Sequence, residues 1–141
     1  MCIRDRPRAE RLNHVPLISW QEAIAWPKHK KGASYPTITT EYRYSDNAFA
    51  LMVEEDDWEN LAKDTALLVD PALEAEHRDF VIIYKQGQKI PTLKQVLIDE
   101  EKMYLKPSIQ GYTITLFSLE HRILGIVVEY KKHLRKLAAE D

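Results

Sequence analysis

The stretch DFVIIYKQGQKIPTLKQVLIDEEKMYLKP, residues 79–107, decides the fold of this chain. β-Branched and aromatic residues gather within it in runs, and such runs are typical of β-strands. The runs are Phe80–Tyr84, Lys89–Ile98 and Met103–Lys106. Because Gln86-Gly87-Gln88 and Asp99–Lys102 separate them, the pattern predicts two successive hairpins that share a strand. Pro91 has no backbone N–H, which indicates an edge or a β-bulge in the middle run.

Short runs of the same kind continue on both sides of this stretch. They are Val15–Ser19, Thr37–Thr40, Ala48–Val53, Ala66–Val69 and Leu124–Tyr130. Helix is expected only at Trp20–Ala25, at Trp58–Lys63 and in the charged tail from Lys131. The sequence therefore predicts a mostly β fold of hairpins and meanders with little helix.

Length and composition favour one soluble domain. The chain has 141 residues, of which 45% are hydrophobic, enough to build a core. Its 20 basic and 22 acidic side chains give a net charge of −2, which excludes a surface that binds nucleic acid through overall charge. No stretch approaches the roughly 18 consecutive apolar residues of a membrane span, so we expect a cytoplasmic protein without a membrane partner.

The ends of the chain are expected to lie outside the domain. Residues 1–6 resemble a translated sequencing adapter and are set aside as an artefact, together with Cys2, the only cysteine. We expect residues 7–14 to form a linker, residues 15–130 the domain, and residues 131–141 a charged tail. The gene is expected to have been truncated upstream.

Further segments, in a definite order, carry a resemblance to a known family. They are Val15–Trp20 with Ala23 and Trp26, Ala48–Glu59 with Thr65–Pro71, Asp79–Tyr84 with Thr92–Val96 and Tyr104–Pro107, and Ile123–Val128. Together they resemble the C-terminal domain of LexA-like and phage-type repressors, which is also the fold of the UmuD proteins. The resemblance implies a LexA/signal-peptidase-like β fold and a Ser-Lys dyad that cleaves its own chain.

The resemblance assigns roles to particular residues. Lys94 falls on the general-base lysine, and Ala23 and Ile24 fall on the family's Ala-Gly cleavage site. In the nucleophile loop, Asp57 stands at the serine position. The neighbouring positions of that loop, a glycine, an aspartate and a methionine in the family, are here Glu55, Asp56 and Trp58.

These substitutions predict a domain that does not cleave itself. A Ser-Lys dyad needs a neutral lysine to deprotonate the serine, whereas a carboxylate at Asp57 would favour the charged ammonium of Lys94 and raise its pKa. Glu55 replaces a glycine whose backbone freedom would help to line an oxyanion site, and β-branched Ile24 hinders approach to the bond. We expect Asp57 and Lys94 to form an ion pair, with the segment around Ala23 docked nearby as an uncleaved strand.

The function predicted from these residues is the dimerisation and regulatory domain of a transcriptional repressor. The implied partners are a second copy, DNA through an upstream helix-turn-helix domain, and a RecA-like activator, and no cofactor is expected. Two alternatives stay open: an active peptidase that uses Lys94 with another nucleophile, and a free-standing adaptor or anti-repressor. The acidic run Glu54–Asp57 also has alternative interpretations as a solvated loop or, with less support, as a divalent-metal site.

Overall fold

The described part of the chain is mostly β, with antiparallel sheets and one short helix, which confirms the predicted fold class. The computed structural model describes residues 12–28, 34–54, 61–107 and 113–132. Its elements are β1 (Asn13–Pro16), α1 (Trp20–Ala23), β2 (Thr37–Thr40), β3 (Phe49–Met52), β4 (Ala66–Asp70), β5 (Phe80–Lys85), β6 (Thr92–Asp99), β7 (Lys102–Lys106), β8 (Thr115–Leu116) and β9 (His121–Lys131).

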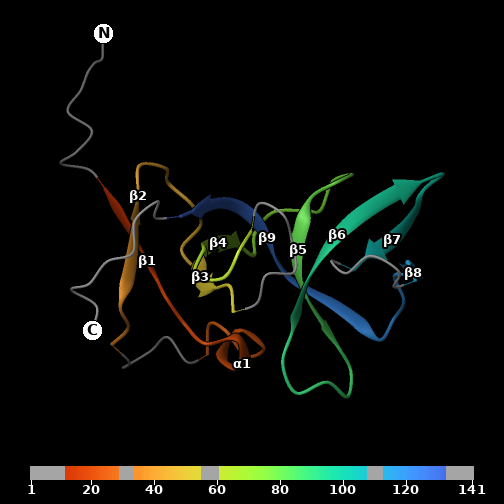
Figure 1. Cartoon of the computed structure of the whole chain (residues 1–141), viewed down its shortest axis with the longest axis horizontal. Helices are drawn as coiled ribbons and strands as arrows, with labels where there is room; N and C mark the ends of the chain where they lie inside the picture. The colour runs from red at the N-terminus through yellow and green to blue at the C-terminus, as the bar shows by residue number, and fades with distance from the viewer. Residues whose placement is uncertain (1–11, 29–33, 55–60, 108–112, 133–141) are drawn as a thin grey trace, which may run out of the picture.

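One long strand joins the two halves of the main sheet. The strand order is β3-β4-β9-β5-β6-β7-β8, and β1 and β2 form a separate two-stranded ribbon. The C-terminal half of β9 pairs with β4 and its N-terminal half pairs with β5. Figure 1 shows β9, in blue, running between them, with the ribbon and α1 on the side of β3.

The ladder of β9 is irregular where it changes partner. Its register shifts opposite Leu68/Val69 of β4 and again opposite Ile82/Ile83 of β5. Such β-bulges bend a strand and increase its twist. Gly125 lies between the shifts, where a Cβ atom would come within 2.5 Å of the Val69 side chain and 3.3 Å of the Pro71 backbone. A side chain at this position has no room.

The core divides between the faces of β5. Ile82 belongs to a cluster with Phe49, Leu51, Leu67 and Ala23, which we call the α1-side cluster. Its neighbours Val81 and Ile83 belong to a second cluster, with Val96, Leu105 and Ile126, which we call the hairpin-side cluster. This division follows from strand geometry, because successive side chains point to opposite faces.

The β1–β2 ribbon is attached to the sheet through Glu129 of β9. The Oε1 atom of Glu129 accepts hydrogen bonds from Thr40 Oγ1 at 2.8 Å and from Tyr44 Oη at 2.7 Å. Lys131 Nζ lies 3.3 Å from its other oxygen. Burial raises the pKa of the Glu129 carboxyl, but the bonds from Tyr44 and Thr40 and the charge of Lys131 outweigh burial and lower it overall. The charged carboxylate therefore holds the ribbon in place.

Asp70 plays a similar part at the end of β4. Its carboxylate accepts from the hydroxyl and the backbone N–H of Ser45 and from the N–H of Ala72. Burial raises the pKa of Asp70, and these hydrogen bonds more than reverse that effect, so its pKa is lowered. The buried carboxylate thereby fixes the loop that enters β3.

Several predicted boundaries are wrong at their ends. The first strand ends at Pro16 instead of Ser19, because the following residues turn toward β3 and Ser19 caps a helix. The middle strand of the hairpins begins at Thr92, not Lys89, so Pro91 lies in the hairpin loop and not in the ladder. The short strand β8 was not predicted.

Of the three predicted helices, the structure describes the first completely and the other two only in part. The first spans four residues, Trp20–Ala23, and not six. Half of the second, residues 58–60, lies outside the described residues, and the other half, residues 61–63, is not helical. In the tail, Lys131 still belongs to β9, and the residues from 133 onward are not described.

Adding a methyl group at Gly125 should destabilise the protein through contact with Val69. We expect Gly125→Ala to lower the free energy of unfolding by about 1–3 kcal/mol, the usual cost of overpacking. Val69→Ala removes the nearest contacting atom, so in that background the same change should cost clearly less. Urea unfolding of the four proteins in this double-mutant cycle measures both effects. Additive losses would show that the two side chains do not compete for the same space.

Candidate functional site

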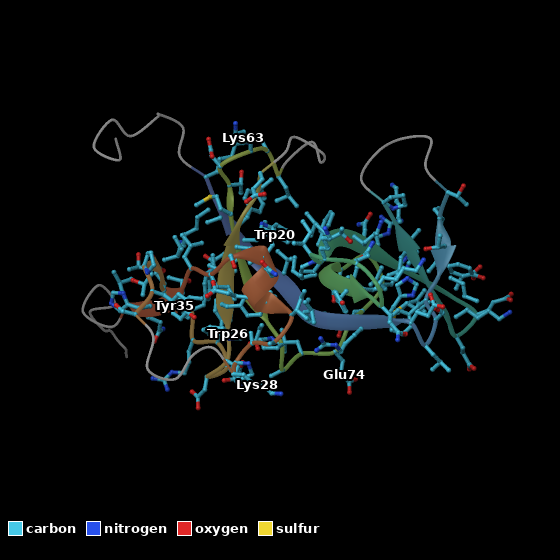
Figure 2. The ribbon with its side chains drawn as sticks, turned by 90° about the horizontal axis from the view of Figure 1, so that it is seen from below. Trp20, Trp26, Lys28, Tyr35, Lys63 and Glu74 are labelled. Carbon is cyan, nitrogen blue, oxygen red and sulfur yellow. The ribbon has the colours of Figure 1, made fainter. Side chains whose placement is uncertain are left out.

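Residues 17–26 form a strap across the outer edge of β3. Leu17 bridges Ala50 in parallel, and the N–H of Ile18 donates to the Ala50 carbonyl at 3.0 Å. Two indole N–H groups donate to carbonyls near the two ends of the same strand: Trp20 Nε1 to Met52 at 2.9 Å and Trp26 Nε1 to Asn47 at 2.9 Å. Figure 2 shows both labelled tryptophans at α1, beside β3. The strap thus uses edge groups that would otherwise face water or another chain.

The centre of the strap is a short capped helix. Ser19 Oγ accepts from the N–H of Glu22, and the Glu22 carboxylate accepts from the N–H of Ser19, which together form a capping box. Ala23 is only 2% exposed and packs in the α1-side cluster. Ile24, the C-cap residue, has helical dihedrals of φ −62° and ψ −38°. The expectation that this segment docks as an extended strand is therefore wrong for Ala23 and Ile24.

An arginine from the far end of the sequence ties the end of the strap to the sheet. Arg122 Nη2 donates to the Ile24 carbonyl oxygen at 2.9 Å, across 98 positions of sequence. The guanidinium lies 5.8 Å from the centre of the Tyr84 ring, which packs against the α1-side cluster. Sequence reasoning did not identify Arg122, and no local pattern marks it, because its partner comes from the opposite end of the domain.

Lys94 lies in β6, partly buried, as the register partner of Val81. Burial lowers the pKa of its ammonium, and the positive charge of Lys85 lowers the pKa further. Both causes favour the neutral amine, which is the form that a general base requires. The environment of Lys94 among the described residues therefore suits proton abstraction.

The structure does not bring Lys94 and the Ala23–Ile24 bond to one face. Leu93 packs against the α1-side cluster, whereas Val81, the register partner of Lys94, belongs to the hairpin-side cluster. Since side chains alternate along a strand, Lys94 leaves β6 on the face away from Ala23. In this conformation the lysine and the bond are separated by the sheet itself.

His121 and Lys85 accompany Lys94 on the hairpin side. They are register partners in β9 and β5. His121 Nδ1 accepts from the N–H of Ser118 at 3.0 Å, and the imidazole stacks on Phe117 with the ring centres 5.6 Å apart. Burial, followed by the charge of Lys85, lowers the pKa of His121, while Glu120 opposes this change. Lys85 therefore acts on the pKa of both Lys94 and His121.

The nucleophile loop lies mostly outside the described residues. Glu55, Asp56, Asp57 and Trp58 all belong to that part, so the expected ion pair between Asp57 and Lys94 stays a prediction. The flanks of the loop are fixed, because Val53 donates its N–H to the Thr65 carbonyl at 2.8 Å and accepts from the N–H of Asp64 at 2.8 Å. The residue that follows β3 and the residues that precede β4 are therefore hydrogen-bonded to each other, so the two ends of the loop lie side by side.

Two features are absent from the part of the chain that the structure describes. Within residues 12–28, 34–54, 61–107 and 113–132, no group of three or more His, Cys, Asp or Glu side chains could hold a metal ion. None of the helices in those ranges is long and apolar enough to cross a membrane.

The described fold is an antiparallel sheet with a partly buried lysine on its β5–β6 hairpin and a strap, residues 17–26, along β3. These features can be compared with known families. A family profile described as Peptidase S24-like matches residues 16–128. The chain belongs to this family, and the resemblance found in the sequence is confirmed.

Curated relatives share about the same stretch. The chain is 28% identical over 127 residues to an uncharacterised HTH-type transcriptional regulator of Coxiella burnetii, covering 84% of this chain and 59% of that protein. It is 28% identical over 134 residues to repressor protein C2 of Salmonella phage P22, with 88% and 62% covered. It is 29% identical over 125 residues to the HTH-type transcriptional regulator for conjugative element R391 of Providencia rettgeri, with 80% and 57% covered. The chain thus spans about three fifths of the length of these relatives.

Removing the charge of Lys85 should raise the pKa of Lys94. We expect Lys85→Gln to move this pKa part of the way toward its ordinary value near 10.5, because burial continues to lower it. In the wild type the pKa of Lys94 is lower in the folded protein than in the unfolded chain, where it is near 10.5. Between these two pKa values the unfolded chain binds more protons, so the free energy of unfolding increases as the pH rises through this range.

NMR titration of the lysine side chains measures this shift. Lys102→Gln is the matched control, because Lys102 is an exposed lysine of the adjacent strand β7. A Lys94 pKa that responds equally to both changes, or to neither, would show that Lys85 does not act on Lys94 directly.

Proposed function

We propose that this chain is the regulatory and dimerisation domain of a DNA-binding transcriptional repressor, and that it does not cleave itself. The match to the Peptidase S24-like family over residues 16–128 carries the proposal. Relatives named as HTH-type regulators and as a phage repressor support it, and each extends well beyond the part that this chain matches. In this proposal DNA is bound in the cytoplasm by a helix-turn-helix domain of the full-length protein.

Dimerisation follows from how such regulators bind DNA. A two-fold dimer matches two half-sites and gains affinity from linked contacts, so a domain without DNA-reading residues can still control binding by controlling association. A RecA-like activator, implied by the resemblance, completes the set of proposed partners.

Loss of cleavage is argued from two separate features. The first is chemical: a carboxylate at Asp57 is a poor nucleophile toward an amide and would favour the charged form of Lys94. The second is geometric: the Ala23–Ile24 bond is helical and lies on the other face of the sheet from Lys94. A general base acts only within hydrogen-bond reach of the proton that it removes, and Lys94 lies on the other face in this conformation.

Incubation at high pH tests the loss of cleavage, because it deprotonates lysine without any activator. We expect the wild type to stay intact and an Asp57→Ser, Glu55→Gly, Ile24→Gly variant to be cut after Ala23, as read by mass spectrometry. The same variant with Lys94→Ala is the control and should stay intact.

Each outcome bears on a different part of the proposal. A cut wild type would contradict the loss of activity. An intact triple variant that remains folded would contradict the claim that the residues at positions 24, 55 and 57 are what prevents cleavage. Light scattering on the uncut wild type should give the mass of two chains, and a monomer at all concentrations would contradict the proposed dimer.

A further inference from the structure

We propose that Arg122 is a clasp that keeps the Ala23–Ile24 peptide bond in a closed, helical conformation and so controls access to that bond. The inference rests on the proposed function only in taking this bond as the family's cleavage position. The clasp itself is a property of the fold. Arg122 acts here as a positioning residue, with no part in bond breaking.

The contact sits where a short helix most needs a partner. The last carbonyls of a helix have no intrahelical N–H donor, so they accept from water or from a side chain. After α1, the N–H groups of Trp26 and Lys28 donate to Ala23 and Ala25. The carbonyl of Ile24, between these two acceptors, receives the Arg122 guanidinium at 2.9 Å. A charged donor to a backbone carbonyl is a strong hydrogen bond.

The guanidinium is itself held in place by the sheet. Arg122 is the register partner of Tyr84 and stacks over its ring, 5.8 Å from the centre. Tyr84 in turn packs against the α1-side cluster, which contains Ala23. The clasp therefore joins the strap to β9 and β5, whereas the tryptophan bonds and the Ile18 N–H go to β3 and the residues beside it, and the Leu17 N–H goes to Pro36.

Two contacts hold the strap after Ala23: the Trp26 indole on Asn47, at the end of the strap, and the Arg122 guanidinium on Ile24, next to the bond. Ile18 and Trp20 bind the strap to β3 before Ala23, and they would keep that part on β3 even if the following turn unwound. A protease binds its substrate in an extended form, so the bond becomes accessible only when the turn after Ala23 opens. Loss of the clasp should therefore open the turn locally without unfolding the sheet.

Limited proteolysis tests this inference without using the protein's own dyad. We expect an elastase-type protease, which cuts after small residues, to cleave Arg122→Ala within residues 20–28 about tenfold faster than the wild type, since a bond to a charged donor is removed. Arg122→Lys should fall between the two, because its ammonium can still donate but lacks the flat stacking surface. Arg43→Ala, at an exposed arginine between β2 and β3, is the matched control and should behave as the wild type.

Hydrogen exchange distinguishes local opening from global unfolding. In Arg122→Ala the amides of residues 22–28 should exchange faster, while those of β4 and β5 keep their protection. Equal cleavage rates for Arg122→Ala and Arg43→Ala would overturn the clasp, and so would loss of protection spread over β4 and β5. The added protease cuts the chain without the protein's own dyad. This experiment can therefore contradict the role of Arg122 without contradicting the proposed loss of self-cleavage, and the high-pH experiment can do the opposite.

Discussion

The pairing of β9 with both β4 and β5 is the constraint on which the rest of the structure depends. A single strand of 11 residues lies between the two halves of the sheet, and two register shifts let it change partner. Gly125 lies between those shifts because there is no space for a side chain. Arg122 near one end of β9 fixes the strap, and Glu129 near the other fixes the β1–β2 ribbon. The parts that precede the sheet in sequence are therefore positioned by its last strand.

The sequence predicted the elements that carry their own local signal. Alternating β-branched runs and turn residues located β5, β6 and β7, and the hairpin at Asp99–Lys102 forms with the two positive-φ residues Glu100 and Glu101 between the strands. Their order also supported the family, which the profile match confirms. Boundaries failed where tertiary contacts decide them: the strand from Val15 stops early because Leu17 and Ile18 turn to pair with Ala50 of β3.

The site was predicted less completely, for a physical reason. A motif can mark Lys94, because the resemblance rests on the residues around it. No motif can mark Arg122, whose only distinguishing feature is a partner 98 residues away. The face on which Lys94 lies also follows from strand register and not from residue type. Such long-range placements appear only once the strands are paired.

The two proposed reasons for an uncleaved chain act on different steps. The residue at position 57 affects the chemistry of attack, whereas the capping box, the tryptophan bonds and Arg122 affect the shape of the bond to be attacked. Asp57→Ser would restore the first, and Ile24→Gly would weaken the second, because glycine has a low helix propensity. A domain of this kind can keep the recognition surfaces of a peptidase while serving only to bind.

The central prediction is that Asp57 occupies the nucleophile position and faces Lys94. The most direct measurement is the pKa of Lys94, by NMR titration, in the wild type and in Asp57→Asn. The account predicts a lower pKa in the variant, because the carboxylate that favours the charged ammonium is gone. An unchanged pKa would place Asp57 away from Lys94 and contradict the assignment of that residue.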